Sequence, residues 1–164
     1  MRHAESETQR PLPNAAGWRF AIVVARFNQA ITGRLREGAE AALKEAGVAA
    51  GDVEVYDVPG AFELPQAARA AAELGQFDAI VCLGCVIRGA TPHFEYICSS
   101  VAHGIQDASG ETGVPMAFGV LTTDTWEQAE ERVPDGRPNK GFEAAAAALE
   151  MAALFRRVRA GARR

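Results

Sequence analysis

The residues best suited to acid–base chemistry lie in one short stretch, Arg88-Gly89-Ala90-Thr91-Pro92-His93, which follows an apolar run and precedes a helical pattern. A loop of small residues that enters a helix N-terminus presents backbone N–H groups to a phosphate, and Thr91 adds a hydroxyl. His93 lies in the first helical turn, where the helix dipole favours a neutral imidazole that can accept a proton. The stretch predicts an anion site beside a general acid/base, with a structural histidine as the alternative.

Further candidate ligand groups follow the other apolar runs. Phe27 comes after the first run and could stack on a flat heteroaromatic ring or cap the core. Pro59 and Gly60 follow the second run, and after them Ala61 to Glu63 could bind the hydroxyl groups of a polyhydroxylated chain. The alternative is that Glu63 is an ordinary acid at a helix start, where the helix dipole favours it. Arg132 and Lys140 follow the last run and could bind an anionic substrate or be ordinary surface cations.

The pattern of apolar residues predicts the elements that carry these groups. Nearly continuous apolar runs, typical of strands covered by helices on both faces, occur at 18–25, 53–58, 78–87 and 115–122. Helical spacing predicts helices at 31–46, with Gly47 as its stop, and at 62–74, 125–132 and 142–158. Another helix shows its apolar face through Phe94, Ile97, Val101 and Ile105.

Strands that alternate with helices predict an α/β fold, because right-handed crossovers place successive strands side by side. We expect a three-layer α/β/α sandwich around a four-stranded parallel sheet of flavodoxin-like type. Ligands bind such sheets at the carboxyl ends of the strands, where the candidate residues above lie. Residues 1–17 are expected to form a flexible tail before a single domain over 18–164.

Composition limits the partners and the location that we expect. With 164 residues and 48% hydrophobic content, the chain can bury one core without disulfides or metals. A net charge of −4 argues against nucleic acid as a partner. Three cysteines cannot all pair within one chain, which favours reduced thiols in the cytoplasm. The sequence contains neither a long apolar span nor a secretory signal, so we expect no membrane association.

A zinc deaminase is the competing enzyme class, because His93-Phe94-Glu95 matches His-x-Glu and Cys82-Leu83-Gly84-Cys85 matches Cys-x-x-Cys. The two cysteines lie three positions apart on a predicted strand, so their thiols should point to opposite faces of the sheet. The cysteine pair also precedes the His-x-Glu motif instead of following it. We therefore expect no metal site.

Four separated segments resemble the motifs of the lumazine synthase family, in the same order and with similar spacing over roughly residues 20–154. They are Ala25-Arg26-Phe27-Asn28, Val58-Pro59-Gly60-Ala61-Phe62-Glu63-Leu64-Pro65, Leu83-Gly84-Cys85-Val86-Ile87-Arg88-Gly89-Ala90-Thr91-Pro92-His93-Phe94 and Asn139-Lys140-Gly141. The resemblance implies a transferase of riboflavin biosynthesis that condenses 5-amino-6-(D-ribitylamino)uracil with 3,4-dihydroxy-2-butanone 4-phosphate. The products would be 6,7-dimethyl-8-ribityllumazine, phosphate and water, and no cofactor is implied.

The same resemblance implies roles for individual residues. His93 would move protons, and Phe27 would stack on the pyrimidine ring. The edge of the ring would be contacted by Cys85, Val86 and Ile87. The ribityl chain would be contacted by Ala61, Phe62, Glu63 and Lys140. The phosphate would be bound by Ala90, Thr91 and Arg132.

The resemblance also implies that the site lies between subunits. Phe118, Arg132 and Lys140 would come from the neighbouring copy, so a homopentamer or a larger assembly is expected. The alanine-rich stretch 144–148 allows close helix packing, either against a neighbouring copy or against the chain's own sheet. A non-catalytic flavin- or lumazine-binding protein, or a shell-forming one, is the alternative function. The joint presence of His93, Arg132 and Lys140 argues against it.

Overall fold

The computed structural model describes residues 10–162 and contains the strands β1 (Phe20–Ala25), β2 (Val53–Val58), β3 (Ala79–Ile87) and β4 (Met116–Thr123). They form a parallel sheet in the order β2-β1-β3-β4. The predicted strands are confirmed, and the largest shift is at β1, which starts at Phe20 instead of residue 18.

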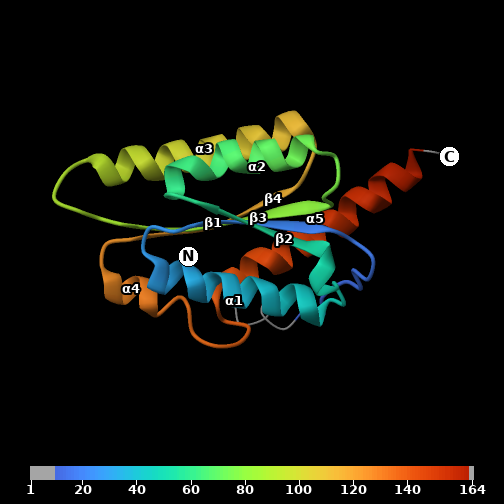
Figure 1. Cartoon of the computed structure of the whole chain (residues 1–164), viewed down its shortest axis with the longest axis horizontal. Helices are drawn as coiled ribbons and strands as arrows, with labels where there is room; N and C mark the ends of the chain where they lie inside the picture. Colours follow the sequence, from blue (N-terminus) through green and yellow to red (C-terminus); the bar gives the residue numbers. More distant parts are fainter. Residues whose placement is uncertain (1–9, 163–164) are drawn as a thin grey trace.

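Helices join the strands and complete three layers (Figure 1). They are α1 (Gln29–Glu45), α2 (Leu64–Glu73), α3 (His93–Thr112), α4 (Trp126–Glu130) and α5 (Lys140–Gly161), with short 3-10 turns η1 (Ala50–Asp52) and η2 (Ala61–Glu63). Helices α2 and α3 cover one face of the sheet, and α1, α4 and α5 cover the other. The predicted three-layer α/β/α sandwich with a flavodoxin-like sheet is confirmed.

Local sequence signals explain where several helices begin and end. Thr125 caps α4, because its hydroxyl accepts the N–H of Gln128 at 3.2 Å. Gly47 follows the end of α1 with φ of 90°, a left-handed conformation that glycine adopts without strain. Helix α5 starts two residues before the predicted position of 142 because Asn139 caps it.

One expectation about the strands is wrong. Each strand was expected to be covered on both faces, but β2 lies at the edge of the sheet and exposes Glu54, Tyr56 and Asp57. A run of apolar residues shows that a segment can form a strand, whereas its place in the sheet depends on the order in which the strands pair. The covered strands are β1 and β3 in the centre.

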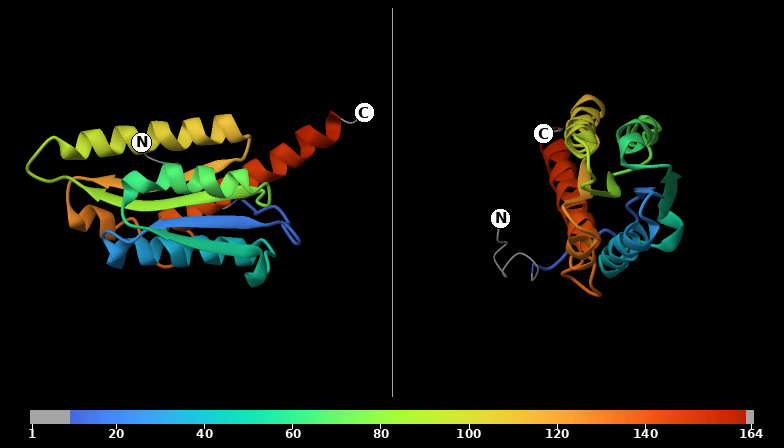
Figure 2. Two further views of the ribbon diagram at one scale, coloured as in Figure 1. Left: turned by 45° about the horizontal axis from the view of Figure 1, so that its top comes forward. Right: turned by 90° about the vertical axis from the view of Figure 1, so that its left-hand side faces the viewer.

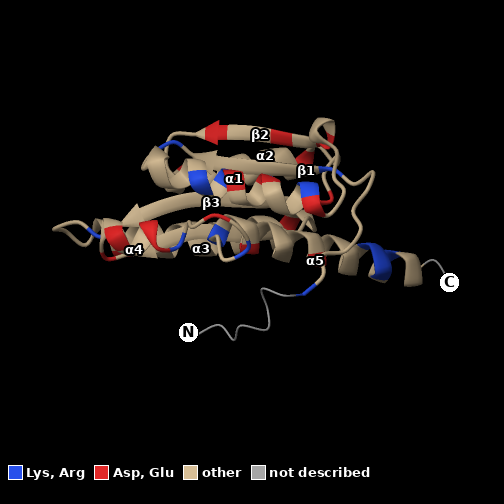
Figure 3. Cartoon of the chain, turned by 90° about the horizontal axis from the view of Figure 1, so that it is seen from below, with Lys and Arg blue, Asp and Glu red and all other residues tan. Residues whose placement is uncertain are grey.

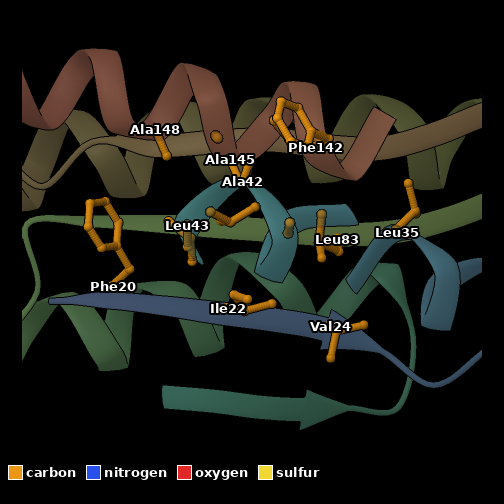
Figure 4. Packing of buried hydrophobic residues seen from close by; sticks show 14 of the residues in the cluster. Phe20, Ile22, Val24, Leu35, Ala42, Leu43, Leu83, Phe142, Ala145 and Ala148 are labelled. Carbon is orange, nitrogen blue, oxygen red and sulfur yellow. The ribbon is translucent and has the colours of Figure 1, made fainter. Parts of the chain in front are cut away.

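Alternate residues of the central strands supply two separate cores. Phe20, Ile22 and Val24 pack against α1 and α5, as Figure 4 shows, and they are at most 4% exposed. Ala21 and Val23 point to the opposite face and pack with residues of α2 and α3. Successive side chains of one buried strand point to opposite faces of the sheet, so the same strand packs against both layers of helices.

Helices α1 and α5 approach each other very closely where α5 begins. A Cβ atom placed on Gly141 would lie 1.9 Å from the Leu35 carbonyl oxygen, so the contact needs a residue without a side chain. Ala145 and Ala148 continue this contact and are at most 1% exposed. Three residues of the alanine-rich stretch, Ala144, Ala145 and Ala148, thus pack in the chain's own core, whereas Ala147 is exposed.

The N-terminal segment lies partly on the domain. Residues 1–9 of the predicted tail lie outside the described residues, whereas Ala15 is fully buried and its N–H donates to the Ala46 carbonyl at 2.8 Å. Helix α5 projects past the sheet (Figure 2). There Arg156 lies over the Trp18 ring at 4.6 Å and pairs with Asp78 at 2.8 Å, which ties the helix to the start of the domain.

Charged residues are spread over the elements. In the view of Figure 3, basic and acidic residues are interspersed along the helices, and the edge strand β2 carries acidic residues. Within residues 10–162, none of the helices combines the length and the apolar content that crossing a membrane requires.

Candidate active site

A cavity of about 430 Å³ lies where β1, β2 and β3 end and α3 begins. It brings together residues predicted from separate stretches of the sequence: Phe27, Ala61, Phe62, Glu63, Cys85, Val86, Ile87, Thr91 and His93. Gly60, Gly89, Phe94 and Ile97 line it as well; Gly89 belongs to the predicted anion-binding loop, whereas no binding role was predicted for the other three. Ala90 is exposed beside this lining but does not belong to it. We call this space the strand-end cavity.

Phe27 forms one wall of the strand-end cavity and is 70% exposed. Its position is set by the backbone, because the hydrogen bonds between β1 and β2 continue past the strand ends. Arg26 N–H donates to the Val58 carbonyl at 2.8 Å, and Phe27 N–H donates to the Pro59 carbonyl at 3.1 Å. An aromatic ring exposed in a cavity, on a fixed backbone, is suited to stacking on a flat ligand.

Asn28, directly after Phe27, has a left-handed backbone, and its side chain bonds to the end of β3. Its φ of 61° and ψ of 48° are left-handed, and it is the only described residue other than glycine with positive φ. Its side-chain Nδ2 donates to the Cys85 carbonyl at 2.9 Å. Its own carbonyl accepts the N–H groups of Ile31 and Thr32 and so starts α1. Sequence reasoning assigned no role to Asn28.

The loop between β3 and α3 is held by Arg88. The Arg88 N–H donates to the Thr123 carbonyl at 2.9 Å, and its Nε donates to Asp124 at 2.7 Å. Its guanidinium also pairs with Glu95 and lies 4.4 Å from the centre of the Phe94 ring. Arg88 therefore joins the end of β4 to the first turn of α3.

Two side chains at the start of α3 could act on a ligand. Thr91 and His93 are both exposed and both line the strand-end cavity. The helix begins at His93 after Pro92, and no side chain caps it. Uncapped N–H groups at a helix start favour an anion, and an exposed imidazole beside them can exchange protons with a bound substrate.

The remaining predicted residues line a different cavity, of about 390 Å³, between the edge strand β4 and α5. Phe118, Arg132 and Lys140 lie there, together with Glu143. Phe118 is 46% exposed although it lies in a strand, because β4 has no strand on its outer side. We call this space the edge cavity.

Both cations of the edge cavity are held by neighbouring groups. Lys140 Nζ pairs with Glu143 at 2.8 Å, and the Lys140 N–H donates to the Arg132 carbonyl at 2.9 Å. The Arg132 guanidinium donates to the Gln128 carbonyl at 2.7 Å. A backbone hydrogen bond therefore links the two residues, and both side chains line the same cavity.

Asn139 holds the segment that carries Lys140. It is only 4% exposed, and its Oδ1 accepts the N–H groups of Gly141 and Phe142. Its Nδ2 donates to the carbonyls of Arg34 and Pro134, at 3.1 and 3.0 Å. These bonds join α1, the preceding loop and α5, so the Asn-Lys-Gly motif combines a buried anchor, a cation and a close helix contact.

The geometry argues against the competing zinc-deaminase hypothesis. Cys82 packs in the core beneath α2 and α3, whereas Cys85 belongs to the core beneath α1 and α5. The thiols thus lie on opposite faces, as predicted, and cannot bind one ion together. Glu95 pairs with Arg88, whose hydrogen bond is the main reason that the pKa of the Glu95 carboxyl lies below its usual value. Residues 10–162 contain no group of three or more side chains suited to a metal.

Burial makes two cysteines poor nucleophiles, which gives a first prediction. Desolvation raises the pKa of Cys82 to about 12 and that of Cys85 to about 11. At pH 8 only about 0.1% of Cys85 would be thiolate, the form that reacts. We expect a thiol-specific disulfide reagent to modify both residues far more slowly in the native protein than in denaturant, with peptide mass spectrometry as the readout. Equal rates in the two states would contradict this environment.

Comparisons with known proteins point to one family. Residues 17–156 match the family model described as 6,7-dimethyl-8-ribityllumazine synthase. A curated protein from Syntrophus aciditrophicus (strain SB), named 6,7-dimethyl-8-ribityllumazine synthase, is 54% identical over 144 residues. The alignment covers 88% of this chain and 94% of that relative.

Proposed function

The chain belongs to the 6,7-dimethyl-8-ribityllumazine synthase family, and we propose that its two cavities are the two parts of one active site, contributed by different copies of the chain. As a member of this family it is a transferase of riboflavin biosynthesis. It condenses 5-amino-6-(D-ribitylamino)uracil with 3,4-dihydroxy-2-butanone 4-phosphate and releases 6,7-dimethyl-8-ribityllumazine, phosphate and water. The observation that carries the two-part site is that Phe118, Arg132 and Lys140 line the cavity at the edge strand β4, apart from Phe27 and His93 in the strand-end cavity.

The strand-end cavity is the proposed site of the uracil ring. The exposed face of Phe27 stacks on the pyrimidine ring. The backbone of Cys85, Val86 and Ile87 forms hydrogen bonds with the edge of that ring. The turn Ala61–Glu63 lines the same space and binds the hydroxyl groups of the ribityl chain. A cavity with an aromatic wall and a few polar groups suits a flat ring that carries a polar chain.

The phosphate-bearing substrate is proposed to lie between the start of α3 and the edge cavity of a neighbour. Ala90 binds the phosphate as part of the loop before α3, and Thr91 adds its hydroxyl group. Arg132 of the second copy adds a guanidinium that can bind two phosphate oxygens. Lys140 of the same copy reaches the ribityl chain. A substrate hydroxyl would then replace part of the present contact between Lys140 and Glu143.

Assembly follows from this division. The edge cavity lies on the outer side of β4, where the sheet has no further strand, so a second chain can reach it. A head-to-tail contact between unlike surfaces closes into a ring when the rotation allows it. We propose a homopentamer or a larger assembly of such rings. Each contact would then form one complete site.

Proton transfer and positioning account for the reaction. The 5-amino group attacks the ketone, and loss of water forms an imine; loss of phosphate and tautomerisation follow. The nitrogen that carries the ribityl chain then attacks the remaining carbonyl, and a second water leaves. The sequence of steps is redox-neutral. His93 moves protons at the leaving groups, Arg132 stabilises the departing phosphate, and the two cavities hold the substrates together.

The cellular location is also a proposal. All three cysteines are free, and Cys82 and Cys85 are buried as thiols. Reduced thiols are typical of the cytoplasm, where we propose that the enzyme works.

A turnover assay tests the proposed function. The purified protein is incubated with both substrates, and formation of the fluorescent lumazine is followed and compared with the spontaneous rate without protein. We expect a rate that is proportional to protein concentration and saturates in both substrates. Binding of the lumazine without turnover would instead favour the non-catalytic alternative, which the joint presence of His93, Arg132 and Lys140 does not favour.

A further inference from the structure

We infer that Asn28 is a positioning residue that holds Phe27 and the end of β3 at the separation required by the uracil ring. The inference deepens the proposed function and rests on it. It starts from the left-handed backbone of Asn28, with φ of 61°. Most side chains disfavour this conformation, and residues other than glycine that adopt it are concentrated at functional sites.

The backbone of Asn28 turns the chain sharply between β1 and α1. Phe27 still continues the hydrogen bonds of β1 with the segment after β2, through the Pro59 carbonyl at 3.1 Å. One residue later, the Asn28 carbonyl accepts the first helical N–H groups, from Ile31 at 2.9 Å and Thr32 at 3.0 Å. The backbone is therefore fixed by hydrogen bonds on both sides of the turn, which holds the Phe27 ring in the wall of the cavity.

The side chain of Asn28 extends the sheet where β1 has ended. Pairing between β1 and β3 stops at Val24 and Leu83, whereas β3 continues beside β4 as far as Ile87. Asn28 Nδ2 donates to the Cys85 carbonyl at 2.9 Å and so takes the place of a strand partner. On the side that faces β1, the end of β3 is therefore held by this side-chain amide, while its other side stays paired with β4.

The direction of the neighbouring backbone groups shows why this bond matters for a ligand. Arg88 N–H points toward β4, since it donates to the Thr123 carbonyl. Backbone groups alternate along a strand, so Ile87 directs its N–H and carbonyl to the other side, the side of Asn28 and the cavity. Asn28 thus holds the end of β3 in place. From there the Ile87 backbone would form hydrogen bonds with the edge of the pyrimidine ring, while Phe27 covers the face of the ring.

Two substitutions separate the backbone from the side chain. Asn28→Gly keeps the left-handed turn, which glycine adopts freely, and removes the amide. Asn28→Asp keeps the size and the tolerance for this conformation but places a carboxylate oxygen against the Cys85 carbonyl. Asn14→Asp is the matched control, because Asn14 is exposed and bonds only to nearby Ala16 in the described structure.

The readouts are the Kd of the lumazine product, measured by its fluorescence, and the KM of each substrate. We expect Asn28→Gly to raise the lumazine Kd and the uracil KM about five- to tenfold, which is the range for one lost hydrogen bond. Asn28→Asp should raise them further. The KM of the butanone phosphate should stay within about twofold of wild type, because the phosphate is bound by other groups.

Several outcomes would overturn the inference. One is wild-type lumazine binding in both Asn28 variants. Another is an equal rise of both KM values together with a lower melting temperature, which would make Asn28 a purely structural residue. Wild-type protein and Phe27→Ala are titrated in parallel. If wild-type protein does not bind lumazine, the proposed function fails. If wild type binds lumazine, Phe27→Ala binds it more weakly and both Asn28 variants bind it as tightly as wild type, then this inference alone fails.

Discussion

Arg132→Ala is expected to weaken binding of the butanone phosphate roughly 30- to 150-fold, which corresponds to about 2 to 3 kcal/mol for one charged hydrogen-bonding group. Binding of the uracil substrate should change little, since that substrate carries no phosphate. The reason is geometric: a planar guanidinium can bind two phosphate oxygens at once. The measurement is the Kd of each substrate alone, by calorimetry, with the assembly state of the variant checked beforehand.

Two controls sharpen this result. Arg132→Lys keeps the charge but loses the two-point contact, so its phosphate affinity should lie between those of wild type and Arg132→Ala. Arg36→Ala removes a half-buried guanidinium that pairs with Glu40 on α1, and it should leave both affinities unchanged. Equal weakening of both substrates by Arg132→Ala would remove Arg132 from the phosphate site.

His93→Ala should lower kcat about 100-fold or more while KM for both substrates changes little, because proton transfer by a positioned side chain typically contributes at least this factor. His93 is exposed at the start of α3, so its loss should not disturb the core. His103→Ala is the matched control on the same helix, where His103 Nδ1 contacts only the Ser99 carbonyl and hydroxyl in the described structure.

The kinetics of the histidine variants discriminate between the two roles. A catalytic His93 predicts a low kcat with normal lumazine binding and a normal melting temperature. A structural His93 predicts the reverse, with a lower melting temperature and a kcat near that of wild type.

Much of the fold could be predicted from the sequence because its signals are local. Apolar runs located β1 and β3, and the hydroxyl of Thr125 marked the start of α4. The exposure of β2 was missed, although Glu54 and Asp57 place charged side chains within that run, as edge strands often do. It depends on the order in which the strands pair, which is a property of the whole chain.

The site was predictable only in part, for the same reason. His93, Phe27 and Arg132 stand out because their side chains have chemistry of their own. Asn28 and Asn139 act through hydrogen bonds to Cys85 and Arg34, which lie far away in the sequence. No spacing rule relates such pairs. An asparagine directly before a helix suggests an ordinary cap, whereas Asn28 makes no such bond and reaches β3 instead.

The central claim is that one active site uses residues from two chains, and subunit mixing tests it most directly. Phe27→Ala and Lys140→Ala proteins, each expected to be nearly inactive, are unfolded together, refolded and assayed for lumazine formation. Native mass spectrometry of the refolded rings establishes that they contain both variants. Each variant refolded alone provides the baseline.

In evenly mixed rings, about one quarter of the head-to-tail contacts would join an intact Phe27 to an intact Lys140. The account therefore predicts recovery of up to about a quarter of the wild-type rate, with no recovery when either variant is refolded alone. Rings shown to be mixed that remain as inactive as the separate variants would place the whole site within one chain and contradict the account.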